Sequence, residues 1–277
     1  MKHTTLAFIG AGNMSRSLIA GLINNGYAAD AIVVADPNSE SLQHFADNYG
    51  VRTFSDNLAA LAVAEIIITA VKPQQMQIVC KQLATQWSAD KLLVSIAAGI
   101  RLEAIERWLA QPNAAVVRAM PNTPSMVQAG ATGLCANRHV STTQHEQAES
   151  ILRAVGVALW VNDEALLDTV TALSGSGPAY FFLVMEAMQN AAIAMGLDDE
   201  TARLLTLETA FGAAKMALES DESVSVLRQR VTSPGGTTER AIAQFETGNL
   251  RGLFANALRA AADRADEMAQ QLGQDHD

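Results

Sequence analysis

Near its start the chain reads Leu6-Ala7-Phe8-Ile9-Gly10-Ala11-Gly12-Asn13-Met14-Ser15. Residues 6–9 form a short apolar run typical of a buried parallel strand, and apolar residues recur at helical spacing over residues 14–23. Gly10 permits a tight turn, Gly12 lets backbone approach a phosphate without an intervening Cβ, and free N–H groups at the helix start face the anion. This order predicts a dinucleotide-binding turn, and a turn with only a structural role is the alternative. The expected cofactor contacts here are Ile9, Gly10, Ala11, Gly12, Asn13 and Met14.

Length and composition describe a folded protein with ample core. Of the 277 residues, 49% are apolar and 17% are charged, which argues against a disordered chain. No apolar run approaches the roughly 18 residues of a membrane span. The first strand starts without a basic and apolar leader, so we expect a cytoplasmic protein. Cys80 and Cys135 lack metal-ligand spacing and the five histidines form no ligand pattern, so no metal site is expected and both thiols are expected to stay reduced.

Charge divides the chain into two parts. Residues 1–161 hold 11 basic and 11 acidic side chains, whereas residues 162–277 hold 8 and 18, so the net charge of −10 lies in the second part. An acidic, helix-rich surface argues against nucleic acid and anionic membranes as partners. The shift predicts two domains, residues 1–161 and 162–277.

The first part alternates strand-like and helical segments. Apolar runs predict strands at 31–35, 51–54, 65–71, 92–96 and 115–119, with helices between them, and two further strand-like runs lie at 131–136 and 158–161. This pattern predicts a Rossmann-like, doubly wound parallel sheet, which binds its ligands outside the carboxyl ends of its strands.

Several polar or small residues follow directly on these strands. Asp36 ends the second strand and can accept hydrogen bonds from ribose hydroxyls, which favours NAD over NADP, although Asn38 and Ser39 could turn toward a 2′-phosphate instead. A turn in which Asp36 serves only the backbone is the other alternative. Lys72 either meets a cofactor hydroxyl or phosphate or is a solvated surface lysine. Ala97 leaves room for a flat ring. Asn122 stands in a stiff loop between two prolines, which is otherwise a rigid connector.

From residue 163 onward the apolar period is helical. A helix over 166–173 breaks at Ser174-Gly175-Ser176-Gly177-Pro178. The next helix, 179–195, is apolar nearly all round and must be buried on every side. About 115 residues are too few to surround it, so the sequence predicts an all-α domain that forms an intertwined dimer.

A second glycine-rich stretch reads Ser233-Pro234-Gly235-Gly236-Thr237-Thr238 and opens a helix. Unpaired N–H groups and hydroxyls at a helix start predict an anion site, here for a carboxylate. A threonine-capped helix start is the alternative.

Taken together, these segments resemble the pyrroline-5-carboxylate reductase family, which completes proline synthesis. The matching segments are Phe8-Ile9-Gly10-Ala11-Gly12-Asn13-Met14, Ala70-Val71-Lys72-Pro73-Gln74, Ser95-Ile96-Ala97-Ala98-Gly99, Arg118-Ala119-Met120-Pro121-Asn122-Thr123-Pro124, Leu173-Ser174-Gly175-Ser176-Gly177-Pro178-Ala179-Tyr180 and Ser233-Pro234-Gly235-Gly236-Thr237-Thr238. They occur in the family's order over nearly the whole chain. Ser15 replaces a commoner alanine, and Asp36 stands where NADPH-preferring members tend to carry smaller polar residues.

The resemblance implies reduction of 1-pyrroline-5-carboxylate to L-proline by hydride from NADP(H), or also NAD(H), in dimers that often assemble further into decamers. A cyclic imine is protonated near neutral pH, so the protein must supply mainly proximity and orientation. Thr238 is the candidate catalytic residue, bonding the substrate nitrogen or carboxylate. The implied substrate residues are Ser233, Gly236, Thr237 and Thr238, and the further implied cofactor residues are Asn57, Ala70, Val71, Lys72 and Pro73.

Two other functions compete with this one. The β-hydroxyacid dehydrogenases also join a nucleotide domain to a helical domain, but Phe181 stands in the place of their catalytic lysine, and Lys215 is expected on a helix flank. A non-catalytic dinucleotide-binding module is the other alternative, and it leaves the anion site at 233–238 without a use.

Overall fold

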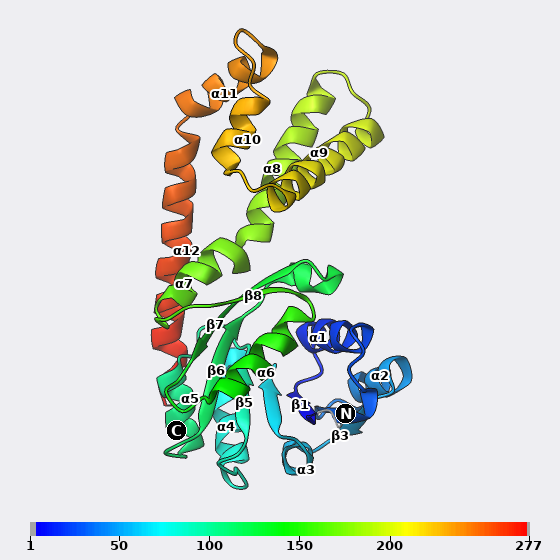
Figure 1. Ribbon diagram of the computed structural model, residues 1–277, viewed down its shortest axis with the longest axis vertical. Coiled ribbons are helices and arrows are strands. Elements are labelled where there is room, and N and C mark those ends of the chain that lie inside the picture. Colours follow the sequence, from blue (N-terminus) through cyan, green and yellow to red (C-terminus); the bar gives the residue numbers. More distant parts are fainter. Residues whose placement is uncertain (1–3, 276–277) are drawn as a thin grey trace. The chain divides into compact units, whose positions relative to one another are not determined.

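The structure is a computed structural model that describes residues 4–275. It divides into two compact units (Figure 1). The first runs through Ser176 and takes up the chain again from Ala260, and the second is Gly177–Arg259. These bounds differ from the expected division at 161/162, because residues 162–176 and 260–275 group with the first unit.

The first unit is built on an eight-stranded sheet with the order β3-β2-β1-β4-β5-β6-β7-β8. The strands are β1 Leu6–Ile9, β2 Ile32–Ala35, β3 Arg52–Phe54, β4 Ile66–Thr69, β5 Leu92–Ser95, β6 Ala115–Met120, β7 Gly130–Ala136 and β8 Gly156–Trp160. The first six strands are parallel, as the sequence predicts. β7 runs antiparallel to β6, and β8 runs parallel to β7. The reversal follows from the short connection Thr123–Val127, which holds no crossover helix.

Helices cover both faces of this sheet, each over its own buried apolar layer. α1 Asn13–Asn24, α2 Ser39–Tyr49 and α6 Thr142–Arg153 bury apolar side chains against one face, where Phe8 and Phe45 are fully buried. On the other face lie α3 Asn57–Val63, α4 Met76–Ala84, α5 Leu102–Leu109 and α7 Leu166–Val170. The doubly wound fold is therefore confirmed.

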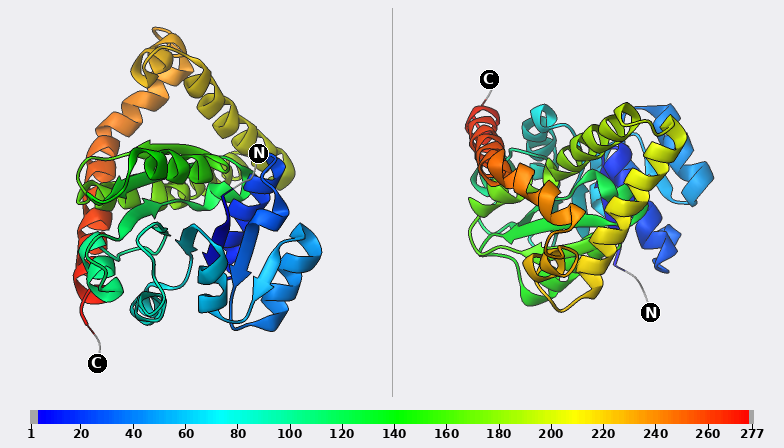
Figure 2. Two further views of the ribbon diagram at one scale, coloured as in Figure 1. Left: turned by 60° about the horizontal axis from the view of Figure 1, so that its bottom comes forward. Right: turned by 90° about the horizontal axis from the view of Figure 1, so that it is seen from above.

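The last helix, α12 Leu250–Leu272, returns to the first unit and was not predicted from the sequence. Its final turns lie beside α5, where Leu272 packs on the second apolar layer (red in Figure 2). The Trp108 indole donates to the Asp275 carboxylate at 2.7 Å just beyond the helix. The C-terminal segment therefore forms part of the nucleotide-domain surface.

The second unit is entirely helical. It holds α8 Gly177–Ala194, α9 Asp199–Glu219, α10 Val224–Arg230 and α11 Thr237–Thr247, followed by the first turns of α12. The expected break before α8 is a π-helical turn, Thr171–Gly175, in which the Ser176 amide donates to the Thr171 carbonyl. Among residues 4–275, no helix combines the length and apolar character that crossing a bilayer requires.

Candidate functional site

The turn between β1 and α1 depends on glycine at its first position. Gly10 has φ +106°, and a Cβ placed on it would lie 2.6 Å from the Ala70 carbonyl oxygen. The turn therefore packs directly against the segment that follows β4. The Ser15 hydroxyl donates to the Gly10 carbonyl at 2.6 Å and ties the helix back to the turn. Serine in place of the commoner alanine thus reinforces the turn.

The start of α1 is open toward solvent. Gly12 is the residue before the helix, no side chain caps the helix there, and a Cβ on Gly12 would meet nothing within 4 Å. The first-turn N–H groups, beginning with Asn13 and Met14, have no intrahelical acceptor. An anion such as a pyrophosphate fits this position, because uncapped amides and the helix dipole both favour negative charge.

A cavity of about 260 Å³ lies beside the turn, at the carboxyl ends of β1 and β2. Five of the predicted cofactor residues line it, and α4 supplies three of the other six. The lining residues are Ile9, Gly10, Ala35, Asp36, Pro37, Asn57, Val71, Gln75, Ile78, Val79 and Gln82. Ile78 is 70% exposed, which is unusual for an isoleucine and suits a wall that a flat aromatic base would cover.

The wall supplied by α4 was missed from the sequence. Gln75, Ile78 or Val79, and Gln82 recur at intervals of three to four residues, so one face of the helix lines the cavity. The Asn57 side chain donates to the Gln82 side chain at 2.8 Å, which fixes both amides at the rim. The sequence carries no signal for this role, because an apolar residue in an amphipathic helix is ordinarily assigned to the core.

Asp36 stands at the end of β2 with both carboxylate oxygens engaged. One accepts the Ala11 N–H at 2.8 Å, and the other accepts the Asn38 N–H at 2.8 Å. The structure therefore shows the backbone role that was the alternative for Asp36, and it also places Asp36 in the cavity wall. The two roles are compatible, because each carboxylate oxygen has more than one acceptor site.

Other predicted cofactor residues surround this region without lining the cavity. Ala70 contacts the glycine turn, and Lys72 is an exposed residue just before the short helical turn Pro73–Gln75. Ala97 is buried after β5. The buried Asn122 accepts the Ala131 N–H and donates to the Ser174 carbonyl, so its amide braces the protein itself. Cofactor contacts by these residues stay predictions.

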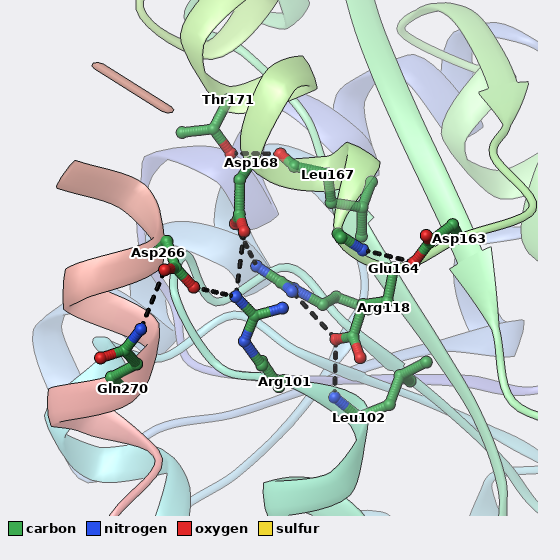
Figure 3. Close-up of polar contacts among 11 residues, drawn as sticks. Arg101, Leu102, Arg118, Asp163, Glu164, Leu167, Asp168, Thr171, Asp266 and Gln270 are labelled. Atoms are coloured by element: carbon green, nitrogen blue, oxygen red, sulfur yellow. Dashed lines mark hydrogen bonds and ion pairs between the residues drawn. The ribbon is translucent and has the colours of Figure 1, made fainter. Parts of the chain in front are cut away.

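An ion-pair network supports the loops at this edge of the sheet (Figure 3). Arg118 on β6 is 2% exposed, and its guanidinium pairs with the Glu164 carboxylate at 2.9 Å. Glu164 also accepts the Leu102 N–H at the start of α5. Arg101 bridges Asp168 of α7 and Asp266 of α12, at 3.0 and 2.5 Å. The network thus joins β6, the β5–α5 loop, α7 and α12.

At Arg101, the positive charge of the guanidinium is balanced by the carboxylates of Asp168 and Asp266. Burial opposes the charge on the Arg101 guanidinium, but the charges of Asp168 and Asp266 and the hydrogen bond with Asp266 outweigh it, so the pKa of Arg101 lies above its ordinary value. Arg101 therefore remains a cation and holds the two carboxylates together. This network was not predicted from the sequence, in which Arg101 and Arg118 lie far from Glu164, Asp168 and Asp266.

The predicted substrate residues lie in the second unit at the start of α11. Gly236 precedes the helix with no side-chain cap, and Gly235 has φ +71°. The Gly235 N–H donates to Glu239 at 2.7 Å, which holds the turn closed on the first helical residues. Ser233 and Thr237 are exposed and Thr238 is half-buried. This geometry brings the four predicted residues into one turn with free helix amides.

Neither thiol suits nucleophilic chemistry. Cys80 and Cys135 are both free and buried, and burial raises the pKa of the Cys80 thiol to about 12. Burial also raises the pKa of Cys135, with a further contribution from the Glu164 charge. Within residues 4–275, no cluster of His, Cys, Asp and Glu side chains has the arrangement of a metal site.

Comparison with known proteins gives two family matches. A family described as "Pyrroline-5-carboxylate reductase dimerisation" matches residues 164–268, and one described as "NADP oxidoreductase coenzyme F420-dependent" matches residues 5–99. A pyrroline-5-carboxylate reductase of Pseudomonas aeruginosa is 50% identical over 274 residues, covering 99% of this chain and 100% of the relative. The chain belongs to the pyrroline-5-carboxylate reductase family. A reductase of Haemophilus influenzae is 45% identical over 269 residues, 97% of this chain and 98% of that one.

Solved structures of pyrroline-5-carboxylate reductases share the fold. A reductase of Coxiella burnetii superposes with a TM-score of 0.93 at 49% identity, over 97% of this chain and 99% of that one. The pyrroline carboxylate reductase of Plasmodium falciparum, solved with NADP bound, has a TM-score of 0.85 at 28% identity, over 97% and 99% of the two chains. The predicted resemblance to the pyrroline-5-carboxylate reductase family is therefore confirmed over the length of the chain.

Proposed function

We propose that this chain reduces 1-pyrroline-5-carboxylate to L-proline with hydride from NADP(H), and also from NAD(H), as the final step of proline synthesis. The observation that carries the proposal is the glycine turn and its cavity, walled by Gly10 and Asp36, in a chain related over its whole length to named reductases. The uncapped helix start at Gly236 supplies the second anion site that a carboxylate substrate requires.

The residues of the first unit are suited to binding and orienting a dinucleotide. The amides at the start of α1 bind the pyrophosphate, Asp36 meets the ribose, and Ile78 with Val79 covers the adenine. When bound, the reduced nicotinamide supplies the hydride. Because the imine substrate carries its own proton near neutral pH, these residues need only position the reactants and exclude water.

We assign the substrate to the turn at the start of α11. The free amides after Gly236 bind the carboxylate, and the hydroxyls of Ser233, Thr237 and Thr238 add donors around it. Thr238 bonds the substrate nitrogen or carboxylate and is the candidate catalytic residue. Ser233, Gly236 and Thr237 are assigned to substrate binding only.

Replacing Thr238 by alanine is expected to lower kcat/KM for 1-pyrroline-5-carboxylate. The expected decrease corresponds to a loss of roughly 1–3 kcal/mol of transition-state stabilisation, the range for losing a hydrogen bond to a charged group. Thr247 at the other end of α11 is the matched control, because its hydroxyl only donates back to the Ala243 carbonyl. Steady-state rates of NADPH oxidation measure both variants. An unchanged kcat/KM for Thr238→Ala removes Thr238 from the site.

We further propose an intertwined homodimer built on the second unit. Phe181, Phe182 and Leu183 of α8 are each at least 65% exposed in the single chain. Exposure of adjacent large apolar side chains on this scale marks an interface, and the dimerisation family match covers α8. Gel filtration with light scattering is expected to show a dimer or a multiple of it, such as a decamer. A monomer at micromolar concentration contradicts the proposal.

We also propose a cytoplasmic location, which is consistent with two buried cysteines that form no disulfide. A β-hydroxyacid dehydrogenase activity has no support in the second unit, because Phe181 is 67% exposed without acid-base capacity and Lys215 lies within 3.9 Å of Glu219 on the flank of α9.

A further inference from the structure

The wall of the cavity beside the glycine turn carries negative charge and no positive charge. Of its eleven lining residues, all within the described part of the chain, Asp36 is the charged one, and the others are apolar residues, glycine, proline, asparagine and glutamine. A 2′-phosphate on a bound dinucleotide would bring about two further negative charges to the ribose. The wall therefore offers no side-chain cation to such a group.

Asp36 is held in a fixed position by the backbone. The Ala11 N–H and the Asn38 N–H each donate to a different oxygen of its carboxylate at 2.8 Å. The first of these bonds links the carboxylate to the glycine turn, so the ribose wall and the phosphate turn form one rigid piece. Moving Asp36 away from a 2′-phosphate would cost both bonds.

The residues after Asp36 do not compensate its charge. The Asn38 side chain accepts the Ser41 N–H at 3.0 Å and so already caps α2. Glu40 adds a second carboxylate in the first turn of that helix. A 2′-phosphate approaching this end of β2 therefore meets the Asp36 carboxylate, whereas a free 2′-hydroxyl finds an acceptor there.

We propose that Asp36 makes this enzyme select NAD(H) over NADP(H), by accepting the 2′-hydroxyl and repelling the 2′-phosphate. The inference rests on the proposed dinucleotide site. NADP(H) remains a cofactor, used less efficiently. Specificity of this kind arises from a repulsive element against the competitor as well as from a contact with the preferred ligand.

Binding of cofactor fragments tests this without turnover. By calorimetry, the unaltered protein is expected to bind ADP-ribose at least about tenfold more tightly than 2′-phospho-ADP-ribose, the scale of one close like-charge contact in a partly exposed site. Equal or tighter binding of the phosphorylated form overturns the inference. This comparison needs no variant and stands even if the protein does not turn over 1-pyrroline-5-carboxylate.

Asp36→Asn then identifies the residue, because asparagine removes the charge at nearly the same volume. Its single amide oxygen can accept from only one of the Ala11 and Asn38 N–H groups, so the ratio between the two cofactors, and not the affinity for either one, is the readout. We expect the NADH-to-NADPH ratio of kcat/KM, and the matching ratio of fragment affinities, to fall about tenfold or more. Asp47→Asn, an exposed α2 carboxylate that bonds only the Gln43 side chain in the structure, is expected to leave both ratios unchanged. Ratios that do not move in Asp36→Asn overturn the role of Asp36. Absence of turnover with both cofactors overturns the proposed function instead.

Discussion

Replacing Arg118 by methionine is expected to lower the free energy of unfolding by about 3–5 kcal/mol, the range for removing one partner of a buried ion pair. Methionine fills much of the same volume but leaves Glu164 without its cation. The variant also removes a nearby positive charge from Asp168. The Asp168 Oδ1 is buried without a hydrogen-bond partner in the described structure, and the Arg118 guanidinium lies 3.9 Å from it. Urea denaturation at one fixed protein concentration measures the change, since an oligomer's stability depends on concentration.

The surface pair between Arg153 and Glu149 provides the control for this result. The Arg153 Nε and the Glu149 Oε1 lie 3.2 Å apart, but the Arg153 side chain is 60% exposed. Arg153→Met is therefore expected to cost less than about 1 kcal/mol, as exposed ion pairs do. If Arg118→Met costs no more than Arg153→Met, the network in Figure 3 does not hold the loops at the edge of the sheet.

Replacing Gly10 by alanine is expected to weaken NADPH binding by about 10- to 100-fold, which corresponds to roughly 1–3 kcal/mol of strain in the turn. The new Cβ would lie 2.6 Å from the Ala70 carbonyl oxygen, and φ +106° is unfavourable for alanine. Relief of the clash moves the turn away from the end of β4 and displaces the amides that face the phosphate. Fluorescence titration with NADPH measures the dissociation constant.

Gly26 separates loss of binding from loss of stability. It has φ +85°, so alanine is strained there too, but a Cβ would meet nothing within 4 Å and the residue lies outside the cavity wall. Gly26→Ala is expected to lower stability while leaving the dissociation constant for NADPH unchanged. Unaltered NADPH affinity in Gly10→Ala would show that the turn does not bind the cofactor.

The nucleotide domain was predictable from sequence because its signals are local. The apolar run before Gly10 and the helical period after it define a strand, a turn and a helix within about twenty residues. The strand at Ile66–Thr69 is β-branched throughout, as expected for a strand covered on both faces. The secondary structure of such short segments can therefore be predicted from their own residues.

Features that depend on distant residues were not predictable in this way. The return of α12 to the first unit rests on Leu272 packing against an apolar layer whose members come from Ala7 to Leu167, and the hydrogen bond from Trp108 to Asp275 spans 167 residues. The network around Arg118 likewise joins residues from four elements. The role of Ile78 needed the cavity itself, since an apolar helical residue is ordinarily read as core.

The most direct test of the proposed reaction follows the hydride itself. Purified protein is mixed with 1-pyrroline-5-carboxylate and NADPH or NADH that carries deuterium on the transferred position, and both cofactor absorbance and proline are measured. We expect oxidation of the cofactor and formation of L-proline with one deuterium on the ring carbon that was part of the imine. Bound cofactor that is not oxidised, or oxidation without deuterated proline, would contradict it.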